Sequence, residues 1–168
     1  SQFGLEKDKN YKYNDNKKTY TFKNGSVEKF AQLPYIPSDS NYEYLGSKEY
    51  TDIWLEEASE LTVKALEAAD TRCRWMLKDY DLSPKILLTS NPHDGWLFTE
   101  FYAPHRDGRL EDYRAFVRAL VTDNPDPDFV RIYLTSLNQI KDDGLRARIR
   151  DGNWEYSNDD RILYYHDR

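Results

Sequence analysis

Apolar and polar residues alternate early in the chain, in the stretch TYTFKNGSVEKF at residues 19–30, which has Asn24 and Gly25 at its centre. A period of two residues is typical of a strand, and Asn-Gly between two such runs is the strongest short signal for a hairpin turn. The pattern therefore predicts a β-hairpin in this segment. The residues before it, up to Lys18, are polar and rich in lysine.

Short apolar runs without alternation occur three times further along the chain: IWL at residues 53–55, KILLTSNP at residues 85–92 and YRAFVRALVTDNP at residues 113–125. Such runs, separated by helices, are typical of parallel strands that are covered on both faces. After the first run, apolar residues recur at helical intervals and predict a helix from about Thr62 to Leu77. The predicted fold class is α/β, with a mostly parallel sheet flanked by helices and a β-hairpin at its start.

Local signals predict three further elements. Tyr44 and Leu45 lie in a connection rich in Pro, Ser, Asp and Asn, where we expect only a short strand. Asp126, followed by a proline, marks the start of a helix. A last helix is predicted over Leu145–Arg150 and is expected to end at Gly152.

Polar side chains follow the first two apolar runs. Glu56 and Glu57 come directly after IWL, and Thr89, Ser90 and Asn91 end the second run. Ligands of open parallel sheets bind beyond the carboxyl ends of the strands, so the two groups are expected to lie side by side if their strands are neighbours. The distance of about 30 residues between them is that of one strand–helix–strand unit.

A carboxylate pair at such an edge suits phosphoryl transfer. One carboxylate holds the Mg²⁺ that bridges the β- and γ-phosphates, and the other orients or deprotonates the attacking water. Both groups also have a purely structural interpretation. Two glutamates at the start of a helix are favoured by the helix dipole, and Asn-Pro is a common turn signal.

Composition narrows the class of protein. With 168 residues, 39% of them hydrophobic, the chain is expected to form one domain with a moderate core. The net charge of −6 argues against a surface that binds nucleic acid throughout, so a DNA contact would be local. Cys73 is the single cysteine and is expected to be a small buried residue of a reducing compartment. No apolar run is long enough to cross a bilayer, which predicts a soluble, cytosolic protein.

The order of these motifs resembles the ATPase domain of the large terminase subunit of tailed phages, the motor that pumps DNA into the procapsid. The resemblance runs from Phe3 to the C-terminus and rests on the ordered set NGS, IWLEEASELT, TRCRW, KILLTSNP, VTDNPDPDFVRIYLTSL and GNWEY. It implies a RecA-like P-loop NTPase fold, with Mg²⁺ and ATP as cofactor and substrate. It also implies double-stranded DNA, the portal protein and the small terminase subunit as partners, and a homo-oligomeric ring on the portal in the host cytoplasm, without a membrane.

The resemblance gives the strand-end residues specific roles. IWLEE matches the Walker B motif, so Glu56 takes the metal-side position, where the family commonly has Asp, and Glu57 that of the catalytic glutamate. TSNP matches the coupling motif, in which Thr89, Ser90 and Asn91 sense the γ-phosphate and transmit hydrolysis to movement on DNA.

Two parts of the family pattern do not occur in the chain. There is no GxxxxGK[ST], the loop that grips the phosphates; we expect it upstream of Ser1, and the nuclease domain after GNWEY. Residues 1–156 are thus expected to be the C-terminal portion of the ATPase domain, and residues 157–168 the start of a linker toward the nuclease. Such a fragment is expected to be inactive as an ATPase alone and to bind neither Mg²⁺ nor ATP tightly.

Such motors need an arginine finger, supplied in cis or by a neighbouring subunit, to neutralise charge in the transition state. Arg72 and Arg74 end the predicted helix after the carboxylates and are candidates, with Lys48 as a further one. Their structural interpretation is that cations near a helix C-terminus favour the dipole.

Other chemistry-bearing residues are assigned to structure. His93, His105 and His166 lack the spacing of a metal site. The aromatic residues between Trp96 and Tyr102 are expected in the core rather than stacked on bases. The run GLRARIRDG is expected to be a solvated helix face rather than a phosphate contact.

Two other functional classes stay open. The first is a non-catalytic assembly or binding module, because the phosphate loop is missing from the sequence. The second is a metal-dependent nuclease built on Asp52, Glu56 and Glu57, which would need further carboxylates converging on two metal ions.

Overall fold

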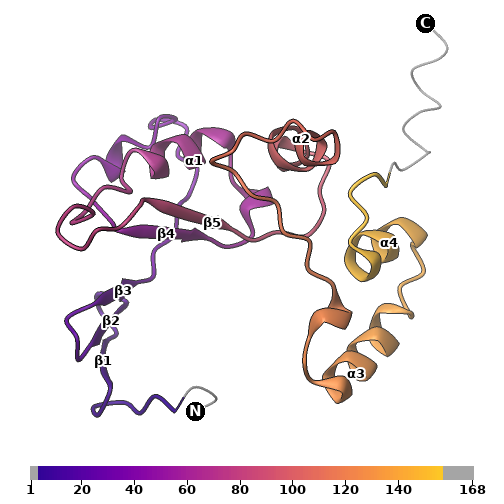
Figure 1. Ribbon diagram of the computed structural model, residues 1–168, viewed down its shortest axis with the longest axis horizontal. Coiled ribbons are helices and arrows are strands. Elements are labelled where there is room, and N and C mark those ends of the chain that lie inside the picture. The colour runs from indigo at the N-terminus through magenta and orange to yellow at the C-terminus, as the bar shows by residue number, and fades with distance from the viewer. Residues whose placement is uncertain (1–3, 157–168) are drawn as a thin grey trace, which may run out of the picture. The chain divides into compact units, whose positions relative to one another are not determined.

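The computed structural model describes residues 4–156 (Figure 1). Packing divides the chain into two compact units, residues 1–34 and residues 35–168, and each is described by itself. The expected linker at residues 157–168, His166 and Phe3 lie outside the described residues. No helix within residues 4–156 is long and apolar enough to cross a membrane.

The first unit is a three-stranded antiparallel sheet in the order β1 (Tyr11–Asn14), β2 (Thr19–Phe22), β3 (Val27–Lys29). The predicted hairpin is confirmed as the β2–β3 pair. Gly25 takes a φ of 87°, which glycine adopts without a steric penalty, and its N–H donates to the carbonyl of Phe22 at 3.0 Å. β1 was not predicted, although the alternation in YKYN places two tyrosines on one face, where rings of Tyr13 and Tyr20 lie 4.6 Å apart.

The second unit contains a two-stranded parallel sheet, β4 (Asp52–Leu55) and β5 (Lys85–Leu88), which lie side by side in Figure 1. The parallel pairing expected for the first two apolar runs is therefore confirmed. Leu55 points to the buried side, whereas Trp54 and Leu87, paired across the strands, are 61% and 56% exposed. One face of this sheet is thus open within the described part of the chain.

The third apolar run does not form a strand, contrary to the prediction. Residues 113–120 follow an irregular path, and Val117 is 84% exposed. Phe116 packs edge-on against Tyr102 and Trp154, and Arg114 donates to the carbonyl and the carboxylate of Glu100. Aromatic and ionic contacts with neighbouring loops thus hold this segment in place of a strand ladder. Whether the whole architecture is RecA-like stays a prediction.

Helix α1 (Val63–Asp70) begins as predicted, because Thr62 accepts a hydrogen bond from the N–H of Ala65 through its hydroxyl. The predicted extension to Leu77 is wrong. The chain leaves the helix at Thr71 and pairs with Tyr50, whose N–H donates to the carbonyl of Arg72 at 2.8 Å. The helical spacing of the apolar residues beyond Asp70 therefore does not reflect a helix.

Cys73 lies in this bridging segment and is buried, as predicted. Its Sγ lies 3.1 and 3.4 Å from the carbonyl oxygens of Thr51 and Lys85, and its one S–H donates to this pair of acceptors. Burial raises the pKa of the Cys73 thiol above its usual range. The residue is therefore an inert part of the core in this unit.

The short strand expected at Tyr44 and Leu45 is instead a 3₁₀ turn, Glu43–Leu45. The reason is local: the carboxylate of Asp39 accepts hydrogen bonds from the N–H groups of Glu43 and Tyr44, at 2.8 and 3.0 Å, and so caps the turn. Leu45 is buried. The predicted strand is therefore wrong.

The remaining helices follow the aromatic segment. A π-helical turn at Phe98–Tyr102 continues into α2 (Ala103–Arg106), and its neighbour Leu97 is buried while the surrounding rings are half-buried. This agrees in part with the expected core role. Helix α3 (Pro127–Leu137) confirms Asp126 as its cap. Helix α4 (Asp143–Asp151) starts two residues earlier than predicted, at the cap Asp142, and ends at Gly152 as expected.

Candidate functional site

The two polar strand ends meet at one edge of the β4–β5 sheet. The N–H of Thr89 donates to the carbonyl of Leu55 at 3.1 Å, and the N–H of Ala58 donates to the carbonyl of Thr89 at 2.9 Å. The backbone ladder therefore continues past both strands and fixes the residues after Leu55 beside those after Leu88. The prediction that the residues after β4 lie beside those after β5 is confirmed for the backbone at Thr89.

Glu57 has an unusual backbone conformation, with φ 50° and ψ 48° in the left-handed region. For a residue with a side chain this conformation costs about 1–2 kcal/mol. It turns the chain from β4 into a 3₁₀ turn, Ala58–Glu60, in which Ala58 is fully buried. Five other non-glycine residues within the described chain share a positive φ (Asp8, Lys18, Tyr42, Met76 and Asp81), so this conformation shapes the turn without marking a site by itself.

The helix dipole does not explain why two glutamates follow β4. Helix α1 begins at Val63 and is capped by Thr62, several residues beyond Glu57, whereas the dipole acts within the first turn. Glu57 precedes only the 3₁₀ turn and makes no side-chain capping bond there. Within residues 4–156, neither Glu56 nor Glu57 uses its carboxylate in a hydrogen bond or ion pair, and both are exposed. Both carboxylates are thus available to a ligand.

Trp54 orients the hydroxyl of Thr89. Its indole N–H donates to the Thr89 hydroxyl oxygen at 3.2 Å, and since an indole can only donate, the hydroxyl must accept. The hydroxyl proton of Thr89 is then left to donate to another acceptor. Thr89 therefore carries an oriented donor, and its backbone lies beside that of Glu56 and Glu57.

The segment after Thr89 is irregular and forms no hydrogen-bonded turn over residues 89–93, so the turn expected from Asn-Pro is not confirmed. The hydroxyl of Ser90 donates to the carbonyl of Asn91 at 2.8 Å, and Asn91 is exposed. Pro92 is buried, and its carbonyl accepts a hydrogen bond from Nε of Arg148 at 2.8 Å. The segment is therefore held in place at Pro92, while Asn91 stays exposed to a ligand.

The carboxylate pair fits a weakly held magnesium ion. Mg²⁺ usually keeps several waters and is bound through one or two carboxylates together with the phosphates of its substrate. Glu56 and Glu57 carry this type of ligand at the sheet edge. The described residues contain no cluster of three or more His, Cys, Asp or Glu side chains suited to a metal.

The nuclease hypothesis is not favoured by this geometry. Asp52 stands at the start of β4 and Glu56 follows its end, so the two lie about 13 Å apart along the strand. Carboxylates that share two metal ions must converge within a few Å of them. The three acidic residues of that hypothesis therefore do not form one centre within the described unit.

The arginine-finger candidates lie near the other end of β4. Arg72 donates to the carbonyl of Gly46 at 2.9 Å, and Arg74 forms an ion pair with Glu49 at 2.9 Å. Both flank the bridge to Tyr50, about 20 Å along the strand from Glu56. Within one chain, Arg72 and Arg74 do not reach the carboxylates. An arginine finger supplied to the site of a neighbouring subunit stays a prediction. Lys48 lies over the ring of Tyr44, 5.2 Å from its centroid.

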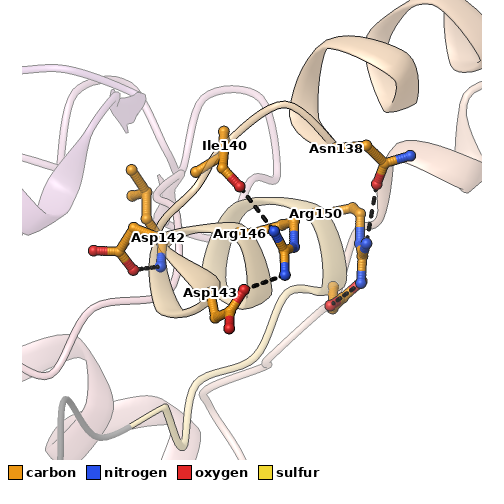
Figure 2. Close-up of polar contacts among 8 residues, drawn as sticks. Asn138, Ile140, Asp142, Asp143, Arg146 and Arg150 are labelled. Atoms are coloured by element: carbon orange, nitrogen blue, oxygen red, sulfur yellow. Dashed lines mark hydrogen bonds and ion pairs between the residues drawn. The ribbon is translucent and has the colours of Figure 1, made fainter.

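The arginines of helix α4 were missed by the sequence analysis. The solvated helix face expected for GLRARIRDG is wrong: all three arginines of RARIR are half-buried and bind other segments. Arg146 donates to the carbonyl of Ile140 and Arg150 to the side chain of Asn138 (Figure 2), while Arg148 reaches Pro92. The signal was present in their spacing of two residues, which directs alternate side chains to opposite sides of a helix.

A cleft of about 480 Å³ lies elsewhere, between helices α3 and α4. Its lining includes Arg118, Asn138, Arg150 and Asp151. Arg150 binds the Asp151 carboxylate through two hydrogen bonds and lowers the pKa of that carboxyl, and Arg118 donates to the Asp151 carbonyl. These arginines offset the negative ends of two helices, so the cleft is held together by its own charges and is not the predicted site.

The two remaining histidines within the described residues have local contacts. Nδ1 of His93 accepts the N–H of Gly95 at 3.0 Å, and the ring of His105 packs at 5.0 Å from that of Phe116.

No protein-family model, no curated protein and no solved structure matches the chain. The resemblance to the terminase ATPase domain therefore stays a prediction that depends on the motifs and their order.

Proposed function

We propose that this chain is part of the large terminase subunit, an ATP-driven motor that moves viral DNA into a procapsid. The observation that supports the proposal is the meeting of two unpaired carboxylates with a Thr-Ser-Asn segment at the carboxyl edge of a parallel strand pair. That edge is where open α/β sheets bind their ligands. The Thr89 hydroxyl, which accepts a hydrogen bond from Trp54, adds to this support.

In the proposed reaction, each residue at the edge has a separate task. Glu56 binds Mg²⁺, directly or through water, and the ion when bound neutralises charge on the β- and γ-phosphates. Glu57 accepts a proton from the attacking water as general base. Thr89 donates its free hydroxyl proton to a phosphate oxygen, and the exposed Asn91 contacts the γ-phosphate.

The phosphate-binding loop of this proposal comes from a polypeptide segment other than these 168 residues, since they contain no GxxxxGK[ST]. The proposed partners are double-stranded DNA, the portal protein and the small terminase subunit. Further copies of the subunit form a ring on the portal in the host cytoplasm and supply Arg72 or Arg74 to the neighbouring site.

The test compares Glu57→Gln, Glu56→Gln and Glu60→Gln in the motor subunit that carries the phosphate-binding loop. Glu57→Gln removes the base, so ATP turnover is expected to fall by about 10² or more while Mg-ATP still binds. Glu56→Gln weakens the metal site, so added Mg²⁺ is expected to restore part of its turnover. Glu60, an exposed acid in the same turn, serves as the matched control.

Two outcomes of this comparison contradict the proposal. If Glu57→Gln and Glu56→Gln hydrolyse ATP at the rate of Glu60→Gln, the edge is not an ATPase site. If both lose turnover equally and independently of Mg²⁺, the separate tasks are wrong.

The exposed face of the β4–β5 sheet favours a second candidate, a non-catalytic assembly module. Parallel strands are normally covered on both faces, yet Trp54 and Leu87 leave an apolar pair open to solvent. Calorimetry with Mg-ATP on the motor subunit separates the candidates, because an assembly module binds no nucleotide, whereas the motor does.

A further inference from the structure

Arg148 joins helix α4 to the segment that follows Asn91. Its Nε–H donates to the carbonyl of Pro92 at 2.8 Å, across 56 residues of sequence. Pro92 is buried and Arg148 is half-buried, so this charge-assisted hydrogen bond is partly shielded from water. The carbonyl belongs to the residue directly after Asn91, which the proposed function places at the γ-phosphate.

Helical geometry explains why Arg148, and not its neighbours, makes this contact. At 100° per residue, Arg146 and Arg150 lie about 40° apart on one side of α4, and Arg148 lies about 160–200° from both. Arg146 and Arg150 face the α3 side, where they bind the Ile140 carbonyl and the Asn138 side chain (Figure 2). Helix α4 is therefore linked to α3 on one side and to the Pro92 segment on the other.

Helices α3 and α4 are linked by a hydrogen bond between side chains. Arg150 connects the C-terminal cap of α3 to the last turn of α4 through Asn138, at 3.0 Å. Gly144 of α4 is buried, and a Cβ there would lie 1.8 Å from the ring of Tyr156, so the helix packs against the segment that follows it without space for a side chain. The link from α4 to α3 is therefore the bond between Arg150 and Asn138.

We propose that Arg148 is a positioning residue that couples the Thr89–Asn91 segment to the α3–α4 helix pair. The inference rests on the proposed function, because it takes Asn91 as the residue that responds to the γ-phosphate. When this segment shifts on loss of that phosphate, the Pro92 carbonyl moves with it, and the bond to Arg148 draws α4 and α3 along. Arg148 touches no reacting atom; it carries the movement from the nucleotide edge to the helices.

The first experiment tests the bond itself on this chain and needs no nucleotide. Amide hydrogen exchange is measured for wild type, Arg148→Gln, Arg148→Lys and Arg131→Gln. Arg131 lies on the exposed face of α3, paired with Asp128, and gives the same change of charge as a control. Arg148→Gln is expected to speed exchange at residues 93–98 by about tenfold, the effect of losing one charge-assisted hydrogen bond, with Arg148→Lys closer to wild type. Unchanged exchange at these residues would overturn the inference.

The second experiment tests coupling in the motor subunit and measures base pairs translocated per ATP hydrolysed. Arg148→Gln is expected to keep ATP turnover within about threefold of wild type and to lower the ratio by about tenfold, a common size for coupling between two sites. Arg148→Lys restores part of the ratio, and Arg131→Gln leaves it unchanged. If Arg148→Gln keeps the wild-type number of base pairs per ATP, or if its amide hydrogens exchange faster throughout the chain, Arg148 only stabilises the fold and the coupling role is wrong.

The two experiments also separate this inference from the proposed function. If the wild-type motor subunit hydrolyses no ATP, the proposed function fails and the coupling role fails with it, while the exchange data still decide whether Arg148 holds the segment. If the wild type hydrolyses ATP and Arg148→Gln translocates normally, the coupling role alone is wrong.

Discussion

At the scale of single residues, the candidate site depends on one backbone conformation and one side-chain hydrogen bond, and the sequence predicts neither. Glu57 adopts the left-handed conformation, and Thr89 accepts a hydrogen bond from Trp54. The first bends the chain at the end of β4. The second leaves the hydroxyl proton of Thr89 free to donate.

The strain at Glu57 predicts an unusual response to glycine. Glycine relieves about 1–2 kcal/mol of left-handed strain, while it costs about 0.5–1 kcal/mol in unfolded-chain entropy. Glu57→Gly is therefore expected to leave the free energy of unfolding unchanged or to raise it by up to about 1.5 kcal/mol, as measured by urea denaturation of this chain. Glu56 has no positive φ, so Glu56→Gly is expected to destabilise by about 0.5–1 kcal/mol. If both substitutions lower the free energy of unfolding equally, the backbone at Glu57 is not strained.

The bond between Trp54 and Thr89 predicts that their substitutions interact. Trp54→Phe removes the indole donor and Thr89→Val removes the acceptor, so the double variant is expected to cost less stability than the sum of the single ones. The interaction energy is expected to be about 0.5 kcal/mol, near the lower end for a neutral hydrogen bond because Trp54 is 61% exposed. Additive changes in the free energy of unfolding would mean that this bond does not hold the hydroxyl.

At the scale of elements, short helices are fixed by side chains at their ends. Helix α2 ends at Arg106, which binds both Asp107 and Glu155, and Arg109 binds Asp107 at 2.7 Å. Arg106 ties the end of α2 to the segment after α4 through Glu155, which lies far away in sequence. The local pairs of Arg106 and Arg109 with Asp107 depend on the Asp107 carboxylate being charged.

The arginines lower the pKa of Asp107 from 3.8 to about 2, Arg106 having the larger effect. Because the folded pKa is the lower one, the contribution of Asp107 to stability is present above pH 4 and is lost as the pH falls toward 2. We expect an NMR titration of Asp107 to show a midpoint near 2 in the wild type. Arg106→Gln is expected to raise that midpoint toward 3.8, and Arg131→Gln is not. An unchanged midpoint in Arg106→Gln would show that the ion pair is absent in solution.

At the scale of the whole molecule, the edge carries carboxylates and a hydroxyl donor but no loop that grips phosphates. Such a loop supplies several backbone N–H groups and a lysine, without which triphosphate binding is weak. Under the proposed function, the chain by itself lacks the loop that would retain the triphosphate.

It follows that this chain alone is expected to turn over no ATP. Mg-ATPase activity of the purified 168-residue chain is expected to equal that of its Glu57→Gln variant, which controls for contaminating ATPases. Steady turnover above that control would show that the chain binds phosphates by other residues, and the division between this chain and a separate phosphate loop would be wrong.

Several features were determined by the sequence itself, because their causes lie within a few residues. Asn24-Gly25 specifies the β2–β3 hairpin, Asp126 caps α3 and Gly152 ends α4, and each signal depends on local backbone preference or a nearby N–H group. The polar residues that follow β4 and β5 were also predicted from the sequence, because each apolar run stops at them. These features would be recognised in any context.

The tertiary structure decided what depends on distant partners. Helix α1 stops at Thr71 rather than Leu77 because Tyr50 takes the following residues into a bridge. The run at residues 113–120 is as apolar as β5 but finds aromatic neighbours instead of a strand to pair with. Arg148 meets Pro92 across 56 residues, a contact that helical spacing permits but does not specify. Local preferences set how each segment can fold, and the energy of long-range contacts selects among those possibilities.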